Sequence, residues 1–246
     1  MRTNGTWLLL GMVAGSSLFW MQYVDLKDHI KPEPRRRLIT AFLLGLPACG
    51  LAILVFTILE RFGLPGVDSG GVPWTAAFCF LLIGPIEEGV KVLVAYLFVF
   101  RWSEFDEPID GFVYASAISL GFASLENLYN LPNLPLWEQL ARTAALPLTH
   151  TLFAAVWGFG IAHARVCVPP GRRLKWEVGT VALAMFLHGL YDFLLFAYQA
   201  NLITSDLILV IWGCVIYRAR VIAKRGGQCK VPLLQTIPVK EPATPH

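Results

Sequence analysis

Long apolar segments follow one another along the whole chain and constrain its fold more than any other feature. A helix needs roughly 20 apolar residues to cross the hydrocarbon core of a bilayer. Segments of about this length lie at 7–24, 38–59, 74–100, 111–129, 142–164, 177–199 and 203–217. The sequence therefore predicts an all-α polytopic membrane helix bundle of about seven transmembrane helices. Because the third segment is long and the last is short, counts of six or eight remain open.

The composition also indicates a chain that is surrounded largely by lipid. Hydrophobic residues make up 56% of the 246 residues and charged residues 15%, whereas a soluble domain carries about a quarter charged residues. The five cysteines are widely spaced and form no CxxC pair, so they predict neither a disulfide framework nor a thiolate zinc site. No basic stripe is interleaved with aromatic residues, which argues against a nucleic-acid partner.

Lysine and arginine are unevenly distributed between the two sides of the predicted bundle. The first, third and fifth loops and the C-terminal tail carry 16 of these residues, and the opposite side carries 3, namely Arg2, Arg61 and Arg142. The positive-inside rule then places the N-terminus outside and the C-terminus in the cytoplasm of a multi-pass plasma-membrane protein. The first segment is long for a signal peptide, so we expect it to be retained. We expect residues 1–223 to form one transmembrane domain and the polar residues 224–246 to form a disordered tail.

Ionisable side chains lie inside the predicted spans, where they are costly. They are Glu87, Glu88, Lys91, Glu126, His150, His188 and Asp192, with Asn127 beside Glu126. Insertion scales put one charged side chain at mid-helix about 3 kcal/mol uphill. These groups must therefore face one another or a watery cavity, and by default they predict a functional site.

The spacing of these residues supports a common site. Lys91 is four residues from Glu87 and three from Glu88, so it can meet either carboxylate on one helix face. His188 and Asp192 are also four apart. A single Glu–Lys pair would be explained by a structural ion pair, but the second carboxylate would then be left over. Counting from the span ends places these groups between mid-membrane and the outer face, so we expect one cavity that opens outward.

Small residues form stripes on two of the spans that carry polar groups. One stripe is Ala115, Ser119 and Ala123 before Glu126, and the other is Ala154 and Gly158 after His150. Such stripes allow close helix approach in membranes.

Two prolines precede the polar groups. We expect a kink at Pro85, where the missing N–H breaks the helical hydrogen-bond series. Pro147 either kinks the fifth span or begins it as a first-turn proline. The acidic residues of the loops, including Glu33 and Glu104, are expected to be solvated, and Tyr114 is expected to anchor or pack.

Several membrane proteases are poor matches to this pattern. The chain has no HExxH sequence, which a zinc site-2-type protease requires. It also has no GxGD sequence and no convincing GxSx serine within a span. The pattern therefore requires a different arrangement of carboxylates and histidines.

Four polar motifs come in order on four successive spans. They are EEGVK (Glu87–Lys91), GFASLEN (Gly121–Asn127), the isolated His150 and HGLYD (His188–Asp192). This pattern, with an early Pro-Glu-Pro run at Pro32–Pro34, resembles the PrsW family of intramembrane proteases over roughly residues 1–200. That family is related to the CAAX-type prenyl proteases. Phe122-xxx-Glu126 and His188-xxx-Asp192 resemble two CAAX motifs, with glutamate and aspartate in place of histidine and asparagine.

The resemblance implies hydrolysis of a peptide bond in a single-span membrane protein near its extracytoplasmic side. In the PrsW family this is the first cut in a membrane-anchored regulator such as an anti-sigma factor. A proton-coupled transporter or a non-catalytic scaffold would also bury such residues. The chain shows no internal repeat of the kind usual in transporters, and all four motifs are intact.

Two versions of the hydrolytic mechanism stay open. In the metal-free version, Glu87 or Glu88 is the general base, His150 or His188 helps to hold the water, and Lys91 keeps one carboxylate ionised. His188 and Asn127 would then contact the oxyanion. In the metal version, His150 and His188 bind a divalent ion, for which zinc is the candidate, together with Glu126 or Asp192.

Overall fold

The computed structural model describes residues 2–25 and 32–199, and seven scattered positions between 208 and 221. These residues are helical or in connections, and no strand occurs among them. The α-helices are α1 (Arg2–Asp25), α2 (Arg35–Arg61), α3 (Gly71–Phe78), α4 (Gly84–Leu97), α5 (Pro108–Asn130), α6 (Leu136–Cys167) and α7 (Pro170–Tyr198). A π-helical segment, Cys79–Ile83, joins α3 to α4, and short 3₁₀ turns follow α4 and α5.

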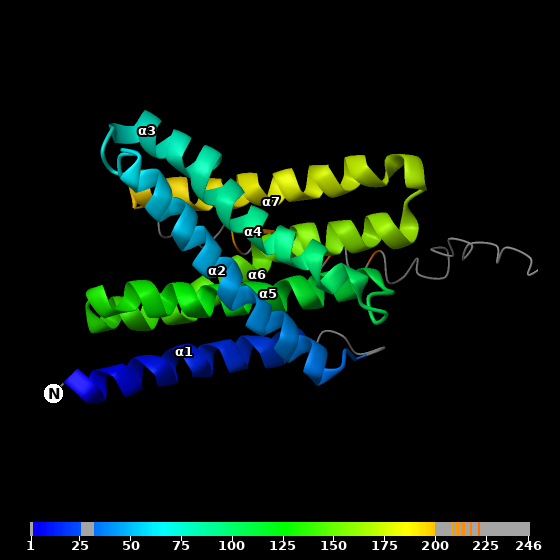
Figure 1. Ribbon diagram of the computed structural model, residues 1–246, viewed down its shortest axis with the longest axis horizontal. Helices are drawn as coiled ribbons and strands as arrows, with labels where there is room; N and C mark the ends of the chain where they lie inside the picture. Colours follow the sequence, from blue (N-terminus) through cyan, green and yellow to red (C-terminus); the bar gives the residue numbers. More distant parts are fainter. Residues whose placement is uncertain are drawn as a thin grey trace, which may run out of the picture.

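The helices form a bundle in which two directions cross. In Figure 1, α1, α5, α6 and α7 run along the long axis of the molecule, while α2 and the path through α3 and α4 cross them obliquely. The start of α2, the connection between α4 and α5 and the connection between α6 and α7 lie together at one end, on the right. The all-helical architecture expected from the sequence is therefore confirmed.

Five helices among the described residues are long and apolar enough to cross a membrane, namely α1, α2, α5, α6 and α7. The predicted third span, 74–100, is a helical path but not a single α-helix. Pro85 cannot donate to the carbonyl of Leu81, which lies inside the π-helical segment, so the α-helical hydrogen-bond series is broken there. The predicted seventh span, 203–217, falls largely outside the described residues, and the expected count of seven is not established.

The helices begin before their apolar segments do, and the difference is largest for α6 and α7. Helix α6 begins at Leu136 rather than at 142, and α7 begins at Pro170 rather than at 177. Helix α7 begins with Pro170, and proline is compatible with the first turn of a helix. The first turns of α6 and α7 carry polar residues and can extend beyond the membrane into water. One consequence is that Arg142, expected at the outer end of the fifth span, lies more than one turn inside α6.

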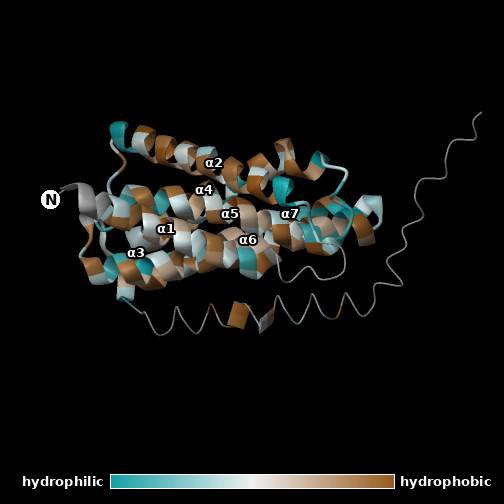
Figure 2. Cartoon of the chain, turned by 90° about the horizontal axis from the view of Figure 1, so that it is seen from below, coloured by the Kyte–Doolittle hydropathy of each residue, from teal (hydrophilic) through white to brown (hydrophobic). Residues whose placement is uncertain are grey.

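Helix α5 is the centre of the bundle. In its apolar window 83% of residues are buried, compared with 17% in α1 and 22% in α2 and α7. The outer helices instead expose large apolar side chains such as Leu43, Leu54 and Phe186. Figure 2 shows hydrophobic colour along α2, with hydrophilic colour gathered near the helix ends. This distribution fits helices whose outer faces meet lipid.

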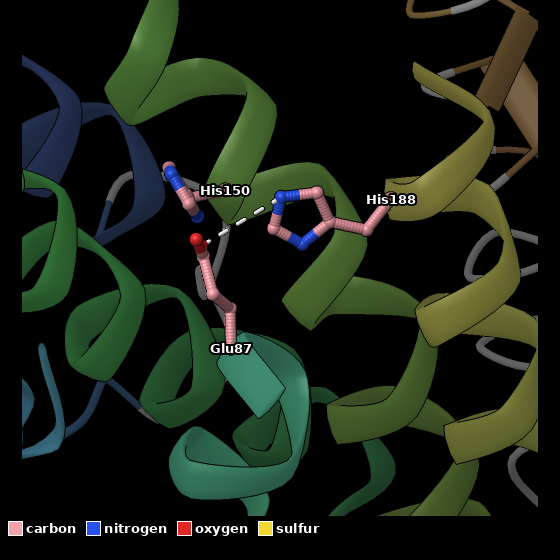
Figure 3. Close-up of side chains that lie close together, drawn as sticks. All are labelled: Glu87, His150 and His188. Carbon is pink, nitrogen blue, oxygen red and sulfur yellow. Dashed lines mark ion pairs between the residues drawn. The ribbon is translucent and has the colours of Figure 1, made fainter. Parts of the chain in front are cut away.

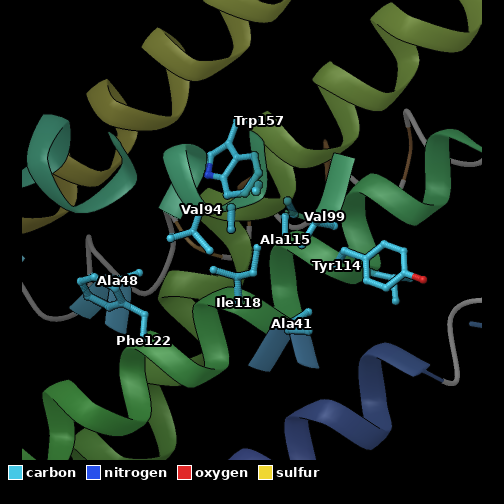
Figure 4. Close-up of a cluster of buried hydrophobic side chains, with 14 of the residues drawn as sticks. Ala41, Ala48, Val94, Val99, Tyr114, Ala115, Ile118, Phe122 and Trp157 are labelled. Atoms are coloured by element: carbon cyan, nitrogen blue, oxygen red, sulfur yellow. The ribbon is translucent and has the colours of Figure 1, made fainter. Parts of the chain in front are cut away.

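The buried core joins α2, α4, α5 and α6. Figure 4 shows Ile118 and Phe122 of α5 between Ala48 of α2, Val94 of α4 and Trp157 of α6. All five side chains are at least nine-tenths buried. Because lipid tails are as apolar as these side chains, close packing rather than escape from water holds such helices together.

Helices α5 and α6 pack with their backbones in close contact. A Cβ atom added at Gly111 would overlap the backbone carbonyl of Gly158, and one added at Gly158 would overlap the carbonyl of Gly111 and the side chain of Ala115. The small-residue stripes predicted on these two spans therefore do allow close approach.

Pro147 lies inside α6 and does not begin it. It cannot donate to the carbonyl of Thr143, one turn earlier. The hydroxyl of Ser16 on α1 donates to that carbonyl at 2.6 Å. Helix α1 thus satisfies the backbone group that the proline leaves free.

The expectation that Glu33 and Glu104 are merely solvated is wrong. Glu33 is only 6% exposed and accepts a hydrogen bond from the hydroxyl of Tyr114 on α5. Glu104 accepts hydrogen bonds from Arg37 at 2.8 and 3.1 Å, and this guanidinium lowers the pKa of the Glu104 carboxyl to about 2. Loop carboxylates therefore tie α2 and α5 together, which sequence position alone did not indicate.

We expect Gly111→Ala to destabilise the protein by about 1 to 3 kcal/mol, because the added methyl forces α5 and α6 apart. Gly179→Ala is the matched control, since a Cβ there would meet nothing within 4 Å. That change should be neutral or stabilise by up to about 1 kcal/mol, because alanine favours helix over glycine. Unfolding in mixed detergents measures both, and equal effects of the two changes would contradict the close contact.

Candidate functional site

Glu88 on α4 lies at the centre of a buried polar cluster. Its Oε1 accepts hydrogen bonds from Lys91 Nζ at 2.8 Å and from His188 Nδ1 at 2.9 Å. Its Oε2 accepts one from the indole N–H of Trp157 at 2.8 Å. The side chains of Glu88 and Lys91 are both fully buried. A buried charge is tolerated only when it is paired and fully hydrogen-bonded, and Glu88 meets that condition.

His188 on α7 is oriented by this carboxylate. Since the carboxylate only accepts, Nδ1 of His188 carries the hydrogen and Nε2 is left to face the other side. There Nε2 lies 3.4 Å from Asp192 Oδ2 and 3.8 Å from Glu87 Oε2. Oε2 of Glu87 is buried and has no hydrogen-bond partner among the residues that the structure describes.

His150 on α6 is engaged through both ring nitrogens. Lys91 Nζ lies 2.7 Å from Nδ1, and because an ammonium only donates, this nitrogen accepts. Nε2 therefore carries the hydrogen, and it lies 2.8 Å from Glu126 Oε2 on α5. The other oxygen of Glu126 accepts a hydrogen bond from Arg142 Nη2 at 2.6 Å.

Local backbone features bring α4 and α7 together at this point. A Cβ added at Gly189 would lie 2.7 Å from the carbonyl oxygen of Cys79 in the π-helical segment. A Cβ at Gly84 would overlap the carbonyl of Met185 on α7. π-helical turns are frequent at functional sites. Here the π turn and two glycines let the backbone beside His188 approach the start of α4, one turn before Glu87.

The sequence-predicted residues fall into a central group and a periphery. Glu87, Glu88, Lys91, His150 and His188 form the centre, with Glu126 and Asp192 at its edges. Asn127 is 1% exposed, and neither its amide nitrogen nor its amide oxygen has a partner within the described ranges.

Sequence reasoning missed two residues of this network, Trp157 and Arg142. The signal for Trp157 was a tryptophan at mid-span, whose buried N–H needs a partner. The signal for Arg142 was a cation at the end of a span, close to the carboxylate of Glu126 in the preceding span. It was missed because Arg142 was expected at the membrane surface.

The cluster also fits a divalent metal ion. Glu87, His150 and His188 each offer one donor atom within 4.8 Å of the others, and Figure 3 shows their side chains converging from α4, α6 and α7. The buried oxygen of Glu87, which has no hydrogen-bond partner among the described residues, and the outward nitrogen of His188 suit a cation. For His150 to join them through Nδ1, Lys91 must move away, because one lone pair cannot serve both.

A bundle of apolar helices around a buried glutamate–histidine cluster defines a membrane-embedded protein equipped for hydrolytic chemistry. Comparison with known proteins specifies the class further. Residues 33–219 match the family described as PrsW family intramembrane metalloprotease. The chain belongs to this family and is a multi-pass intramembrane protease.

Relatives named Protease PrsW support this assignment. The Geobacillus kaustophilus protein is 38% identical over 188 residues, which cover 76% of this chain and 78% of the relative. The Bacillus subtilis protein is 33% identical over 189 residues, covering 76% and 81%. The Oceanobacillus iheyensis protein is 30% identical over 209 residues, covering 83% and 91%. No solved structure matches the chain.

Trp157→Phe should destabilise the protein by about 1.5 to 3 kcal/mol, because it removes a hydrogen bond to a buried carboxylate and keeps the aromatic ring. Trp7→Phe is the matched control, since Trp7 is 73% exposed. Unfolding in mixed detergents compares the two variants. A Trp157→Phe protein as stable as the wild type would show that the indole N–H does not support Glu88.

Proposed function

We propose that Glu87 activates the water for peptide-bond hydrolysis and that Glu88 positions His188. The observation that carries this assignment is the contrast between the two neighbouring carboxylates. Both oxygens of Glu88 accept hydrogen bonds, from Lys91, His188 and Trp157, whereas Oε2 of Glu87 has no hydrogen-bond partner in the described part of the chain. A general base needs a free acceptor within reach of the water, and of these two neighbouring carboxylates only Glu87 offers one among the described residues.

We propose that Glu87, His188 and Asn127 carry out the hydrolysis. Glu87 takes a proton from the attacking water, whose oxygen bonds to the carbonyl carbon of the substrate. The same carboxyl then gives the proton to the leaving amine as the peptide bond breaks. His188, held by Glu88 through Nδ1, presents Nε2 to the reacting groups. The buried amide of Asn127 has no hydrogen-bond partner among the described residues, and we propose that its N–H stabilises the oxyanion.

The metal-dependent version is compatible with these roles. Glu87, His150 and His188 would hold the ion, and zinc is the candidate because two histidines and a carboxylate are a common catalytic zinc set. Such an ion would supply Lewis-acid polarisation of the water and of the scissile carbonyl. A carboxylate has two oxygens, so Glu87 can contact an ion with one and accept a proton with the other. In this version Glu126 and Asp192 lie next to the ligands and orient them.

The substrate is proposed to be a single-span membrane protein that is cut near its extracytoplasmic side, as in the release of an anti-sigma factor. The basic ends of the helices support the orientation that this requires. The start of α2 and the connections after α4 and α6, which carry most of the loop arginines, lie at one end of the bundle (Figure 1). By the positive-inside rule this end is cytoplasmic. We propose that residues 1–223 form one transmembrane domain, and the same orientation places the tail, 224–246, in the cytoplasm. The relationship of the family to the CAAX-type prenyl proteases is likewise a proposal.

Glu87→Gln should lower cleavage by a factor of about 100 or more, because it removes the base. It should change the free energy of unfolding much less than Glu88→Gln does, because Oε2 forms no hydrogen bond with the described residues and only faces Nε2 of His188 at 3.8 Å. Glu88→Gln should also abolish cleavage but destabilise the fold by roughly 3 to 5 kcal/mol, since Lys91 loses its buried counter-charge. Cleavage of a panel of tagged single-span membrane proteins and unfolding in detergent measure both effects.

Glu60→Gln is the control for these variants, because Glu60 is exposed at the end of α2. Bound metal is quantified in the same samples, together with His188→Ala. Loss of stoichiometric metal in His188→Ala supports the metal version, while full activity after chelation would contradict it. A Glu87→Gln protein that cleaves like the wild type would show that Glu87 is not the base.

The orientation gives a separate prediction. Cysteine placed at Ser69, between α2 and α3, should react with a membrane-impermeant maleimide added to whole cells. Cysteine at Ser103, between α4 and α5, should react only after the membrane is opened, because it lies at the basic end. The reverse pattern of labelling would place the N-terminus in the cytoplasm.

A further inference from the structure

Arg142 is a member of the polar network that the four sequence motifs do not include. It lies near the start of α6, and its side chain is 31% exposed, more than those of the carboxylates and histidines of the network. Its Nη2 nevertheless donates to Glu126 Oε1 at 2.6 Å. Its Nε is buried and has no hydrogen-bond partner among the described residues. The side chain therefore reaches inward from the rim of the bundle.

The contacts continue from Arg142 to the centre of the site. Glu126 uses one oxygen for Arg142 and brings the other to 2.8 Å from Nε2 of His150. This second contact is short but poorly aligned for a hydrogen bond. Catalytic hydrogen bonds are often poorly aligned before substrate binds and tighten afterwards. Arg142 touches none of the proposed reacting atoms, so any effect that it has on them acts through Glu126.

Each histidine of the site faces a carboxylate that accepts a hydrogen bond from a further side chain. Trp157 donates to Glu88, which accepts from Nδ1 of His188. Arg142 donates to Glu126, which faces Nε2 of His150. A carboxylate that receives one ring N–H decides which nitrogen presents its lone pair to the site. In His188 that nitrogen is Nε2, and in His150 it is Nδ1.

We propose that Arg142 is a positioning residue that holds Glu126 against His150 and thereby sets the tautomer with which His150 faces the site. This inference rests on the proposed role of His150 in hydrolysis. Lys91 supports the same tautomer from the opposite side, but it is shared with Glu88. When Arg142 is removed, Oε1 of Glu126 loses its charged donor, the carboxylate is free to rotate, and His150 no longer has a fixed acceptor at Nε2.

The test is ¹⁵N spectroscopy of histidine-labelled full-length protein in lipid bilayers, with His150→Gln used to assign the His150 signals. Wild type should show His150 with its hydrogen on Nε2. Arg142→Gln should show a mixture in which hydrogen on Nδ1 appears, while the His188 signals stay unchanged. Arg142→Lys keeps the charge and should keep most of the wild-type tautomer. Arg61→Gln is the matched control, because Arg61 is exposed at the end of α2.

Kinetics on the single-span substrate that wild type cleaves complete the test. Arg142→Gln should lower kcat about tenfold, as expected for loss of a group that orients a site histidine, with KM unchanged, and Arg142→Lys should restore part of kcat. A wild-type tautomer and kcat in Arg142→Gln, with His150→Gln inactive, would overturn this inference alone. Full activity in His150→Gln would overturn the proposed role of His150 and this inference with it. If Arg142→Gln does not fold, a wild-type spectrum and kcat in both Arg142→Lys and Glu126→Gln would overturn the inference.

Discussion

The rest of the structure depends on one buried ion pair, Glu88 with Lys91. Both side chains are fully buried, and two charges in a low-dielectric interior are stable only when their hydrogen-bonding capacity is met. Trp157 and His188 provide the remaining donors to Glu88, and His150 accepts from Lys91. These partners come from α6 and α7, so α4 cannot rotate or slide without exposing an unpaired charge. The packing of three helices and the arrangement of the site are consequences of the same interaction.

Two adjacent glutamates carry different roles because neighbouring residues on a helix point about 100° apart. Glu88 points into the bundle and is fully hydrogen-bonded, while Glu87 points toward Nε2 of His188 at 3.8 Å and keeps a buried oxygen without a hydrogen-bond partner among the described residues. A buried acceptor without a partner costs stability, and such costs are typical of functional sites. The satisfied carboxylate contributes to stability, and the unsatisfied one is available for chemistry.

Backbone irregularities give the site its position in the bundle. The π-helical segment precedes α4, Pro85 lies in the first turn of α4 just before Glu87, and Gly84 and Gly189 let α4 and α7 approach closely. In α6, Pro147 lies one turn before His150, and Ser16 of α1 satisfies the carbonyl that this proline leaves free. In a membrane, a broken helix is stable only when neighbouring groups replace the lost hydrogen bonds.

The sequence by itself determined the helical membrane architecture, the family and the residues that converge, because apolar run length and the cost of charge in lipid are local properties of the chain. It left open whether Glu87 or Glu88 is free, and whether Pro147 begins a helix or lies inside one. It missed Trp157 and Arg142, and it wrongly left Glu33 in solvent. These points depend on how each helix is rotated against its neighbours. That rotation is decided by contacts such as Gly111 with Gly158 and Glu88 with Trp157, which join residues far apart in the chain and exist only in the tertiary structure.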